Sequence, residues 1–543
     1  MHVELILLVL SVLFFISIVA DRIGYKFGVP ALLLFLTVGM IFGSGGLGAI
    51  VGEGEPIDIQ NAQAIGSVAM CIILFSGGLD TKLSDIKSVL APGITLATIG
   101  VLITALITGT IIYFIFGWTH AVAFVTLPMA LLMAATMSST DSASVFSIMR
   151  THHIGLKHNL RPLLELESGA NDPMAYVLTS TLIGVVLTLS SGQSDEVSAL
   201  PIIQEIVVQL IMGTVLGFLL GKGLIQIMRR VQLGNEALYP IMVLTACIFI
   251  FSITYYLKGN TYLAVYVGGL IIGNSKFTRR RQTKAFFNGI TWLSQLVMFL
   301  MLGLMVKPLD FLKLEVWLPC LIISIVMIFI ARPAAVWLCM LPFRNYMARD
   351  RMMLSWVGLK GAVPIIFAIM CKANGVPNAD LIFNVVFLCT IVSLLTQGTT
   401  LTNMARYLKL DTPPEQEHRL TYFDLDLPDE IQSTAREVVV SETMLAKGST
   451  PRELDIPPHT LIVMVRRGED FFVPTGASEL QVGDQLLVIS DKDANEAYRQ
   501  LTNEAEEEAQ WREEMQANIR KRFERATQWM AAQREKVKKM NNK

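Results

Sequence analysis

The chain has 543 residues, of which 53% are hydrophobic and only 16% are charged, and its mean hydropathy is +0.53. A soluble protein carries about a quarter charged residues, so this composition excludes a chain that is soluble throughout. The net charge of −1 averages two different solvents. We expect a lipid bilayer and no nucleic acid as a partner.

Thirteen apolar segments have the length of a membrane-spanning helix when tilt and interruptions are allowed for. Their approximate ranges are 3–20, 28–43, 62–79, 91–116, 121–149, 159–190, 199–227, 238–256, 260–274, 286–305, 315–341, 352–371 and 380–404. The sequence therefore predicts an all-α polytopic membrane domain over residues 1–410.

Basic residues in the loops predict the orientation of these segments. The loops on one side hold seventeen Lys and Arg, whereas those on the other side hold four. By the positive-inside rule, we expect the N-terminus outside and the C-terminal part in the cytoplasm, with the protein in the cytoplasmic (inner) membrane.

Two of the predicted helices are interrupted at matching positions. The fifth segment contains the polar run SSTDS at 138–142, and the fifth segment of the second half contains GLKGAVP at 358–364. Such a pair is typical of a transporter built from inverted six-helix repeats with broken helices. The alternative is two unrelated kinks, because Gly and Pro are common in membrane helices.

The polar C-terminal part begins with the linker DTPP at 411–414. A small cytoplasmic α/β domain is predicted over 411–503, small enough that pairing with a second copy is expected. A charged tail over 504–543 is predicted to be helical. Glycines separate the predicted strands, at 437–441, 460–467, 470–474 and 485–490.

The sixth apolar segment contains the run ESGAND at residues 167–172. Ionised side chains at membrane depth cost about 2.5–3.5 kcal/mol each, so they are rare there without a function. Ser168 and Asp172 are four residues apart, as are Glu167 and Asn171, and each pair shares a face of the helix. This run indicates an ion pathway.

A binding site for a monovalent cation and for protons is predicted at Asp172, Asn171, Ser168, Asp141 and Thr140. Within it, the cation itself is expected at Asp172, Ser168 and Thr140. Hard cations prefer oxygen ligands, and an interrupted helix adds free backbone carbonyls. A partly desolvated Asp172 can hold either a proton or a metal cation, but not both. That competition gives exchange if the protein changes conformation only when the site is occupied. The alternative is a structural buried acid with a fixed partner.

Glu167 needs a counter-charge inside the membrane. Arg332, in the eleventh segment, and Lys360, in the second interruption, are the two candidates. A buried pair of this kind fixes a conformation more than it stabilises the fold. The alternative is that Arg332 or Lys360 extends to an interface.

Together these residues resemble the monovalent cation:proton antiporter superfamily, in its NhaP-like sodium/proton branch. The resemblance covers nearly the whole membrane part. Its motifs are Thr140 with Asp141, ESGANDP at 167–173, FSGGLD at 75–80 and GLKGA at 358–362.

The resemblance implies roles for individual residues. In that family the aspartate that matches Asp172 carries the exchanged ion, and Ser168, Thr140 and Asp141 match its neighbours. Glu167 matches a glutamate that is a structural partner of a membrane arginine.

The resemblance also implies a stoichiometry and an assembly. An Asn-Asp pair, here Asn171 and Asp172, implies one proton for one cation with no net charge moved. A homodimer is expected. Many relatives carry Arg where Lys360 stands, which leaves the partner of Glu167 open.

The soluble domain resembles the TrkA-C (RCK-C) domain of potassium transport proteins over about 434–501. Such domains pair and can bind a small regulatory ligand, in some relatives a cyclic dinucleotide. No glycine-rich dinucleotide fingerprint is present, and no cofactor is expected. By association alone, the domain favours potassium over sodium.

We therefore expect a secondary antiporter that exchanges K⁺ or Na⁺ for H⁺, and not an enzyme. The alternative is a gated cation channel with an RCK-like module, but the sequence contains no filter of the Thr-Val-Gly-Tyr-Gly type. A membrane enzyme is disfavoured because the chain has no His-Glu-x-x-His or Gly-x-Ser-x-Gly motif.

Overall fold

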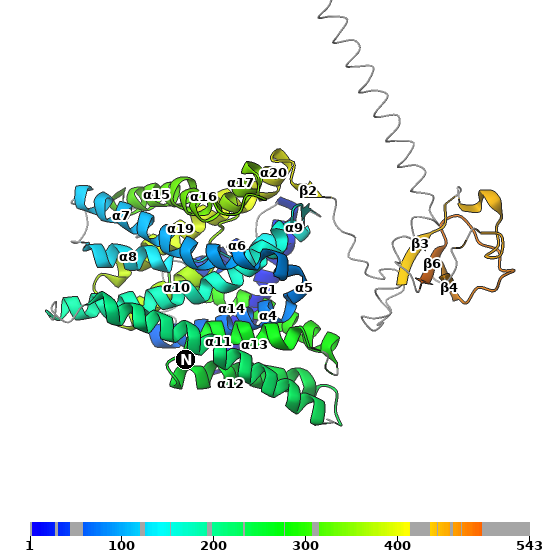
Figure 1. Cartoon of the computed structure of the whole chain (residues 1–543), viewed down its shortest axis with the longest axis horizontal. Helices are drawn as coiled ribbons and strands as arrows, with labels where there is room; N and C mark the ends of the chain where they lie inside the picture. Colours follow the sequence, from blue (N-terminus) through cyan, green and yellow to red (C-terminus); the bar gives the residue numbers. More distant parts are fainter. Residues whose placement is uncertain are drawn as a thin grey trace, which may run out of the picture. The chain divides into compact units, whose positions relative to one another are not determined.

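The computed structural model of the chain divides into two units, with the boundary between Pro414 and Glu415 (Figure 1). The tail predicted to be helical, 504–543, lies outside the described residues, and the domain boundaries at 410/411 and 503/504 stay predictions. The structure describes residues 3–27, 31–43, 58–119, 125–151, 154–192, 198–231, 234–275, 277, 279–306, 314–412, 435–441, 444–454, 456, 460–468 and 470–490.

The first unit is helical. Among the described residues, eight helices are long and apolar enough to cross a membrane, and five shorter apolar helices accompany them. Together they fall on all of the thirteen predicted segments, which confirms the predicted fold class. The helices are α1 (Val3–Phe27), α2 (Ala31–Phe42), α4 (Ile59–Asp80), α5 (Leu83–Ile86), α6 (Leu90–Thr95), α7 (Val101–Thr119), α8 (Leu127–Thr136), α9 (Ser142–Thr151), α10 (Leu160–Ser190), α11 (Ala199–Arg230), α12 (Leu238–Tyr256), α13 (Thr261–Gly273), α14 (Arg280–Leu304), α15 (Leu314–Val326), α16 (Arg332–Cys339), α17 (Ala348–Trp356), α18 (Val363–Ala373), α19 (Ala379–Ser393) and α20 (Thr399–Tyr407).

Irregular backbone recurs at matching places in the two halves. Residues 137–141 interrupt the helix between α8 and α9, and residues 357–362 interrupt it between α17 and α18. A π-helical turn lies in the apolar segment that precedes each interrupted one. These turns are Leu96–Gly100, between α6 and α7, and Met327–Ala331, between α15 and α16. The two halves therefore carry the same two irregularities in the same order, as expected of repeated six-helix units.

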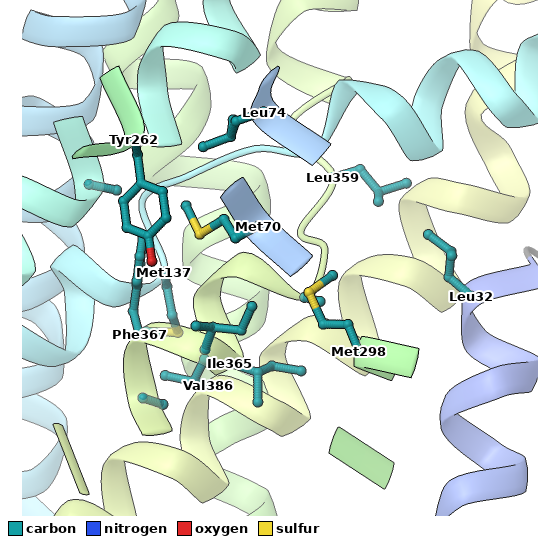
Figure 2. Packing of buried hydrophobic residues seen from close by; sticks show 14 of the residues in the cluster. Leu32, Met70, Leu74, Met137, Tyr262, Met298, Leu359, Ile365, Phe367 and Val386 are labelled. Carbon is teal, nitrogen blue, oxygen red and sulfur yellow. The ribbon is translucent and has the colours of Figure 1, made fainter. Parts of the chain in front are cut away.

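The largest apolar cluster among the described residues lies in the membrane unit and includes residues of both interruptions. Figure 2 shows part of it, with Met137 and Leu359 from the interruptions, Tyr262 of α13 and Phe367 of α18. Tyr176 of α10 meets Tyr262 edge to face, with ring centroids 4.7 Å apart. The interruptions are thus buried in protein, which is where unwound backbone is tolerated at membrane depth.

Helix α13 lies directly against the backbone of α4. A Cβ atom added to Gly78 would lie 2.3 Å from the carbonyl oxygen of Tyr266, and one added to Gly273 would lie 2.2 Å from that of Leu79. Small residues allow such close approach between membrane helices. Any larger side chain at these glycines would force α4 and α13 apart.

A short ladder ties the end of the membrane unit to the connection between α9 and α10. Strand β1 (Gly155–Leu156) pairs antiparallel with β2 (Asp411–Thr412), and the Lys157 N–H donates to the Leu410 carbonyl at 3.0 Å. The chain that leaves α20 is therefore attached beside the start of α10.

The described part of the second unit is an antiparallel sheet in the order β3-β6-β4-β5. All four predicted strands are confirmed, with boundary differences of two residues in β3 and β5. A core of Val438, Val465, Leu486 and Val488 lies on one face. The strands are β3 (Ala435–Val439), β4 (Thr460–Arg467), β5 (Asp470–Phe472) and β6 (Gln485–Ser490), and a 3-10 turn covers Met444–Lys447.

An ion pair links β4 to the turn before β6. Arg467 donates from Nε to Oδ1 of Asp484 at 2.8 Å and from Nη2 to Oδ2 at 2.7 Å. Burial raises the pKa of Asp484, but hydrogen bonds from Arg467 and from the Gln481 N–H outweigh it, so the pKa lies below its usual range. Asp484 is therefore ionised at neutral pH and fixes this turn.

Candidate functional site

The two helix interruptions bond to each other. The Asp141 N–H donates to the Leu359 carbonyl at 2.8 Å, and Nζ of Lys360 donates to the Ser139 carbonyl at 2.8 Å. Unwound backbone leaves donors and acceptors without helical partners, and these must be satisfied where water is excluded. Each interruption therefore supplies partners for the other.

Lys360 lies deep inside this junction and is only 2% exposed. Its N–H donates to Oγ of Ser393 at 3.0 Å, and Ser393 in turn donates to Oε1 of Gln397 at 2.6 Å. Nε2 of Gln397 donates to the Trp356 carbonyl at 2.9 Å. This chain of side chains from α19 and the π-helical turn after it fixes the second interruption, and sequence reasoning missed it.

Helix α10 bonds to the first interruption through two of the predicted site residues. Oγ of Ser168 donates to the Thr140 carbonyl at 2.7 Å, and Nδ2 of Asn171 donates to Oγ1 of Thr140 at 2.5 Å. Both oxygens of Thr140 therefore accept hydrogen bonds from α10. The hydroxyl oxygens of Ser168 and Thr140 keep lone pairs that can face a cation.

Asp172 is buried beside the same junction and is 7% exposed. Among the residues that the structure describes, its Oδ1 makes no hydrogen bond. Asp141 and Lys360 are the charged groups that act on it, and Ser139 is its hydrogen-bonding neighbour. A buried carboxylate oxygen without a donor is free to take a proton or a cation.

Asp141 has a second task that the sequence prediction did not include. Its Oδ1 accepts from the Ser144 N–H at 3.0 Å, and its Oδ2 accepts from the Ser144 hydroxyl. This contact is that of an N-terminal helix cap, here for α9. A Cβ atom at Gly361 would lie 2.3 Å from Oδ2, so this carboxylate also packs against the second interruption. The spacing Asp-x-x-Ser at 141–144 was the signal that could have revealed the cap.

Glu167 forms its ion pair with Arg332, at 2.5 Å, and the two side chains are 1% and 5% exposed. Nη2 of Arg332 also donates to the Leu354 carbonyl at 3.3 Å, and a Cβ atom at Gly358 would lie 3.0 Å from its Nε. Of the two candidates from the sequence, Arg332 thus contacts Glu167, whereas Lys360 reaches Ser139.

Helix α13 holds α10 next to Asp172 through a residue that the sequence prediction missed. Nδ2 of Asn260 donates to the Pro173 carbonyl at 2.7 Å, and its Oδ1 accepts from the Leu263 N–H at 3.0 Å as the N-cap of α13. Pro173 has no N–H, so the Gly169 carbonyl lacks its usual partner within α10. An Asn directly before an apolar helix was the available signal.

The predicted residues thus form two groups. Glu167 and Arg332 make one pair, and the other group surrounds the junction of the interruptions. Among the described residues, no cluster of three or more His, Cys, Asp or Glu side chains could hold a metal ion. One carboxylate with hydroxyl and carbonyl oxygens suits a hard alkali cation better than a transition metal. The second group is Thr140, Asp141, Ser168, Asn171, Asp172 and Lys360.

Two known families match consecutive parts of the chain. The family described as sodium/hydrogen exchanger, transmembrane, matches residues 9–407. The TrkA-C domain matches residues 435–502. The first match contains both interruptions and α10, and the second contains the whole described sheet.

Two named relatives match most of the chain. It is similar to the K(+)/H(+) antiporter NhaP of Alkalimonas amylolytica, with 40% identity over 89% of this chain and 78% of that protein. It is also similar to the K(+)/H(+) antiporter NhaP2 of Shewanella oneidensis, with 35% identity over 91% of this chain and 82% of that protein.

The fold is similar to that of a solved structure, the sodium proton antiporter MjNhaP1 from Methanocaldococcus jannaschii at pH 8. The TM-score is 0.61 at 22% sequence identity, over 74% of this chain and 100% of that one. At this identity the likeness concerns the fold alone.

Proposed function

This chain belongs to the sodium/hydrogen exchanger family, and we propose that it is a secondary antiporter that exchanges an alkali cation for protons across the cytoplasmic membrane. One observation carries the proposal. The buried Asp172 carboxylate lies where two interrupted helices meet, and its Oδ1 makes no hydrogen bond in the described part of the chain.

A proton and a cation compete for Asp172 in this mechanism. The cation replaces the proton on the carboxylate and is also bound by oxygens of Ser168 and Thr140. These two residues lie together because Oγ of Ser168 donates to the Thr140 carbonyl at 2.7 Å. In each half of the transport cycle, Asp172 carries either the cation or the proton while the protein changes conformation. An ionised carboxylate with neither ligand is too costly inside the bundle for the change to occur. Binding and release on opposite sides then couple the two ion gradients.

The exchange is proposed to be electroneutral, one cation for one proton. Asn171 beside Asp172 is neutral and donates to Thr140, and Asp141 is engaged in capping α9. Glu167 is compensated by Arg332. Asp172 is thus the one acid of this group whose charge changes during a cycle.

Potassium is the cation that we favour. The relatives at 40% and 35% identity are named K(+)/H(+) antiporters, whereas the sodium antiporter with a similar fold is 22% identical. The TrkA-C match adds to this preference. Sodium remains the competing substrate, since both cations bind to oxygen ligands.

Regulation, orientation and assembly complete the proposal. The TrkA-C domain binds a small regulatory ligand and adjusts the exchange rate. The surplus of basic residues in one set of loops supports a cytoplasmic C-terminal domain and an external N-terminus. The protein forms homodimers in the membrane.

The purified protein in proteoliposomes tests the exchange. An internal pH dye reports proton movement on addition of each alkali cation, with the membrane potential clamped. We expect saturable exchange that is insensitive to the potential and best with K⁺. Asp172→Asn should abolish it, because the amide can neither bind a proton nor neutralise a cation.

Asp380→Asn is the matched control. Asp380 is 81% exposed and pairs with Lys372 at 2.9 Å on the surface, so its loss should leave exchange unchanged. Wild-type rates in Asp172→Asn would contradict the proposal, and cation flux without proton flux would indicate a channel instead.

A further inference from the structure

Gly169 of α10 forms a notch filled by a side chain of α13. A Cβ atom at Gly169 would lie 2.3 Å from Cε2 of Tyr266, 2.5 Å from Cζ and 2.8 Å from the hydroxyl oxygen. No Cβ atom can approach a ring so closely, so the seat of Tyr266 exists only because residue 169 is glycine. Gly169 is three residues before Asp172, on the same side of α10.

Tyr266 stands on a rigid support. Its own carbonyl lies against Gly78 of α4, where an added Cβ atom would be 2.3 Å away. On the other side of α13, a Cβ atom at Gly217 of α11 would be 2.4 Å from the Ala264 carbonyl oxygen. Helix α13 thus packs backbone to backbone between α4 and α11. A change of position between α10 and α13 must take Gly169 past the Tyr266 ring.

The buried Tyr266 hydroxyl has few hydrogen-bonding partners. The side chain is 4% exposed, and its oxygen makes no hydrogen bond among the described residues. The Thr81 hydroxyl is its hydrogen-bonding neighbour and itself donates to the Gly77 carbonyl at 2.7 Å. In the same turn of α10, Pro173 leaves the Gly169 carbonyl without its helical donor. A buried oxygen that lacks a partner is stabilised when a donor or a cation binds to it.

The face of α10 that carries Gly169 leads from the helix end to Asp172. Arg161, Glu165, Gly169 and Asp172 follow one another at spacings of four, four and three residues, which keeps them on one side. Arg161 and Glu165 pair at 3.0 Å and are 47% and 29% exposed. Along α10, the partly exposed acid therefore comes first, Gly169 with the Tyr266 ring next, and Asp172 last.

We propose that Tyr266 is a gating residue on the route between this end of α10 and Asp172. Its ring closes the route when seated at Gly169, and its hydroxyl gives a dehydrating alkali cation an oxygen contact as it passes. The proposal rests on the antiport function proposed above and adds the path by which the cation reaches the carboxylate.

A pair of compensating substitutions tests the seat of the ring. Gly169→Ala should lower the maximal exchange rate by at least about tenfold, because the methyl group overlaps the ring. Tyr266→Leu lacks the three atoms that the methyl group meets, so Gly169→Ala/Tyr266→Leu should regain at least a third of the Tyr266→Leu rate. Full activity of Gly169→Ala, or a double variant that stays inactive while Tyr266→Leu is active, would overturn the seat.

Tyr266→Phe tests the hydroxyl, because it keeps the ring. The half-saturating K⁺ concentration should rise about three- to tenfold with little change in the maximal rate, since the lost contact is to a charged species. A purely structural tyrosine would change the thermal stability and leave that concentration alone. An unchanged half-saturating concentration for every alkali cation would refute the role of the hydroxyl.

Matched controls separate the gate from general damage. At Gly184, on the same helix, an added Cβ atom meets nothing within 4 Å, so Gly184→Ala should behave as wild type. Tyr113→Phe, at a side chain that is 39% exposed, controls for loss of a hydroxyl. If the wild type does not exchange, the proposed function fails. If it does and Asp172→Asn does not, while the Gly169 and Tyr266 variants match wild type, the gate alone fails.

Discussion

The two helix interruptions have similar backbones and opposite chemistry. The first, between α8 and α9, presents hydroxyls and an acid, with Thr140 bonded to α10 and Asp141 packed against the second interruption. The second, between α17 and α18, presents two glycines and one ammonium group, that of Lys360. The repeated architecture therefore does not repeat the ligands.

This difference divides the work at the site. The first interruption supplies oxygens to α10 and thereby to the space beside Asp172. The second supplies close packing, because Gly358 and Gly361 leave room for Arg332 and Asp141. It also supplies a buried basic group, the amine of Lys360. A symmetric pair of acidic interruptions would place like charges together at low dielectric, which is destabilising. Each of the following substitutions exchanges or removes one of these contributions.

The largest effect is expected from Lys360→Met, which keeps an unbranched side chain one atom shorter and removes the amine. The Ser139 carbonyl loses its donor, and Asp172 and Glu167 lose a basic neighbour. We expect exchange at background level and an unfolding free energy lower by about 3–5 kcal/mol. Proteoliposome flux and thermal unfolding in detergent measure both. Lys372→Met, at the surface end of α18, is the control and should match wild type.

Gly361→Ala should have the next largest effect. Its methyl group would lie 2.3 Å from Oδ2 of Asp141, whereas that of Gly358→Ala would lie 3.0 Å from Cγ and Nε of the longer Arg332 side chain. We expect stability losses of about 1–3 kcal/mol for Gly361→Ala, with a smaller loss for Gly358→Ala. Thermal unfolding of the two variants gives the order. The reverse order would show that the second interruption is not packed around Asp141.

Asp141 variants separate capping from cation binding. Asn caps a helix about as well as Asp, so Asp141→Asn should keep α9 capped and retain a substantial fraction of exchange if capping is the main task. Asp141→Ala should cost about 1 kcal/mol of stability and more activity. Equal and complete loss in both variants would instead indicate that the Asp141 charge binds the cation, as the sequence alone predicted.

The smallest effect is expected from Ser144→Ala. This variant removes one of the two hydrogen bonds from Ser144 to Asp141 and leaves the one from the backbone N–H at 3.0 Å. We expect a loss of about 0.5–1 kcal/mol and near-normal exchange. Thermal unfolding of Ser144→Ala beside Asp141→Ala measures how much of the cap each partner provides.

Much of this arrangement could be predicted from local sequence. Hydropathy indicated the thirteen segments, and the polar run at 138–142 and the Gly-Leu-Lys-Gly run at 358–361 indicated the interruptions, because both signals lie within a few residues of what they specify. The strands of the small domain were predictable for the same reason.

The contacts at the site could not be predicted in the same way. Lys360 meets Ser139 across 221 positions, and Asn260 meets Pro173 across 87. Which basic residue contacts Glu167 depends on how the helices pack, and Arg332 and Lys360 both have the charge that it needs. The π-helical turns also escaped prediction, since their composition is that of any apolar helix.

The ladder between β1 and β2 sets a choice for anyone who shortens this protein. Two residues pair on each side, and two-stranded pairings are marginal in isolation, so the attachment is easily lost. A chain that ends after Pro414 retains Asp411 and Thr412 and keeps β2 paired with β1 before α10. A chain that ends at Lys409 loses this pairing. Comparing the exchange rates of these two truncations separates the effect of removing the soluble domain from the effect of losing the β1–β2 pairing before α10, the helix that carries Asp172.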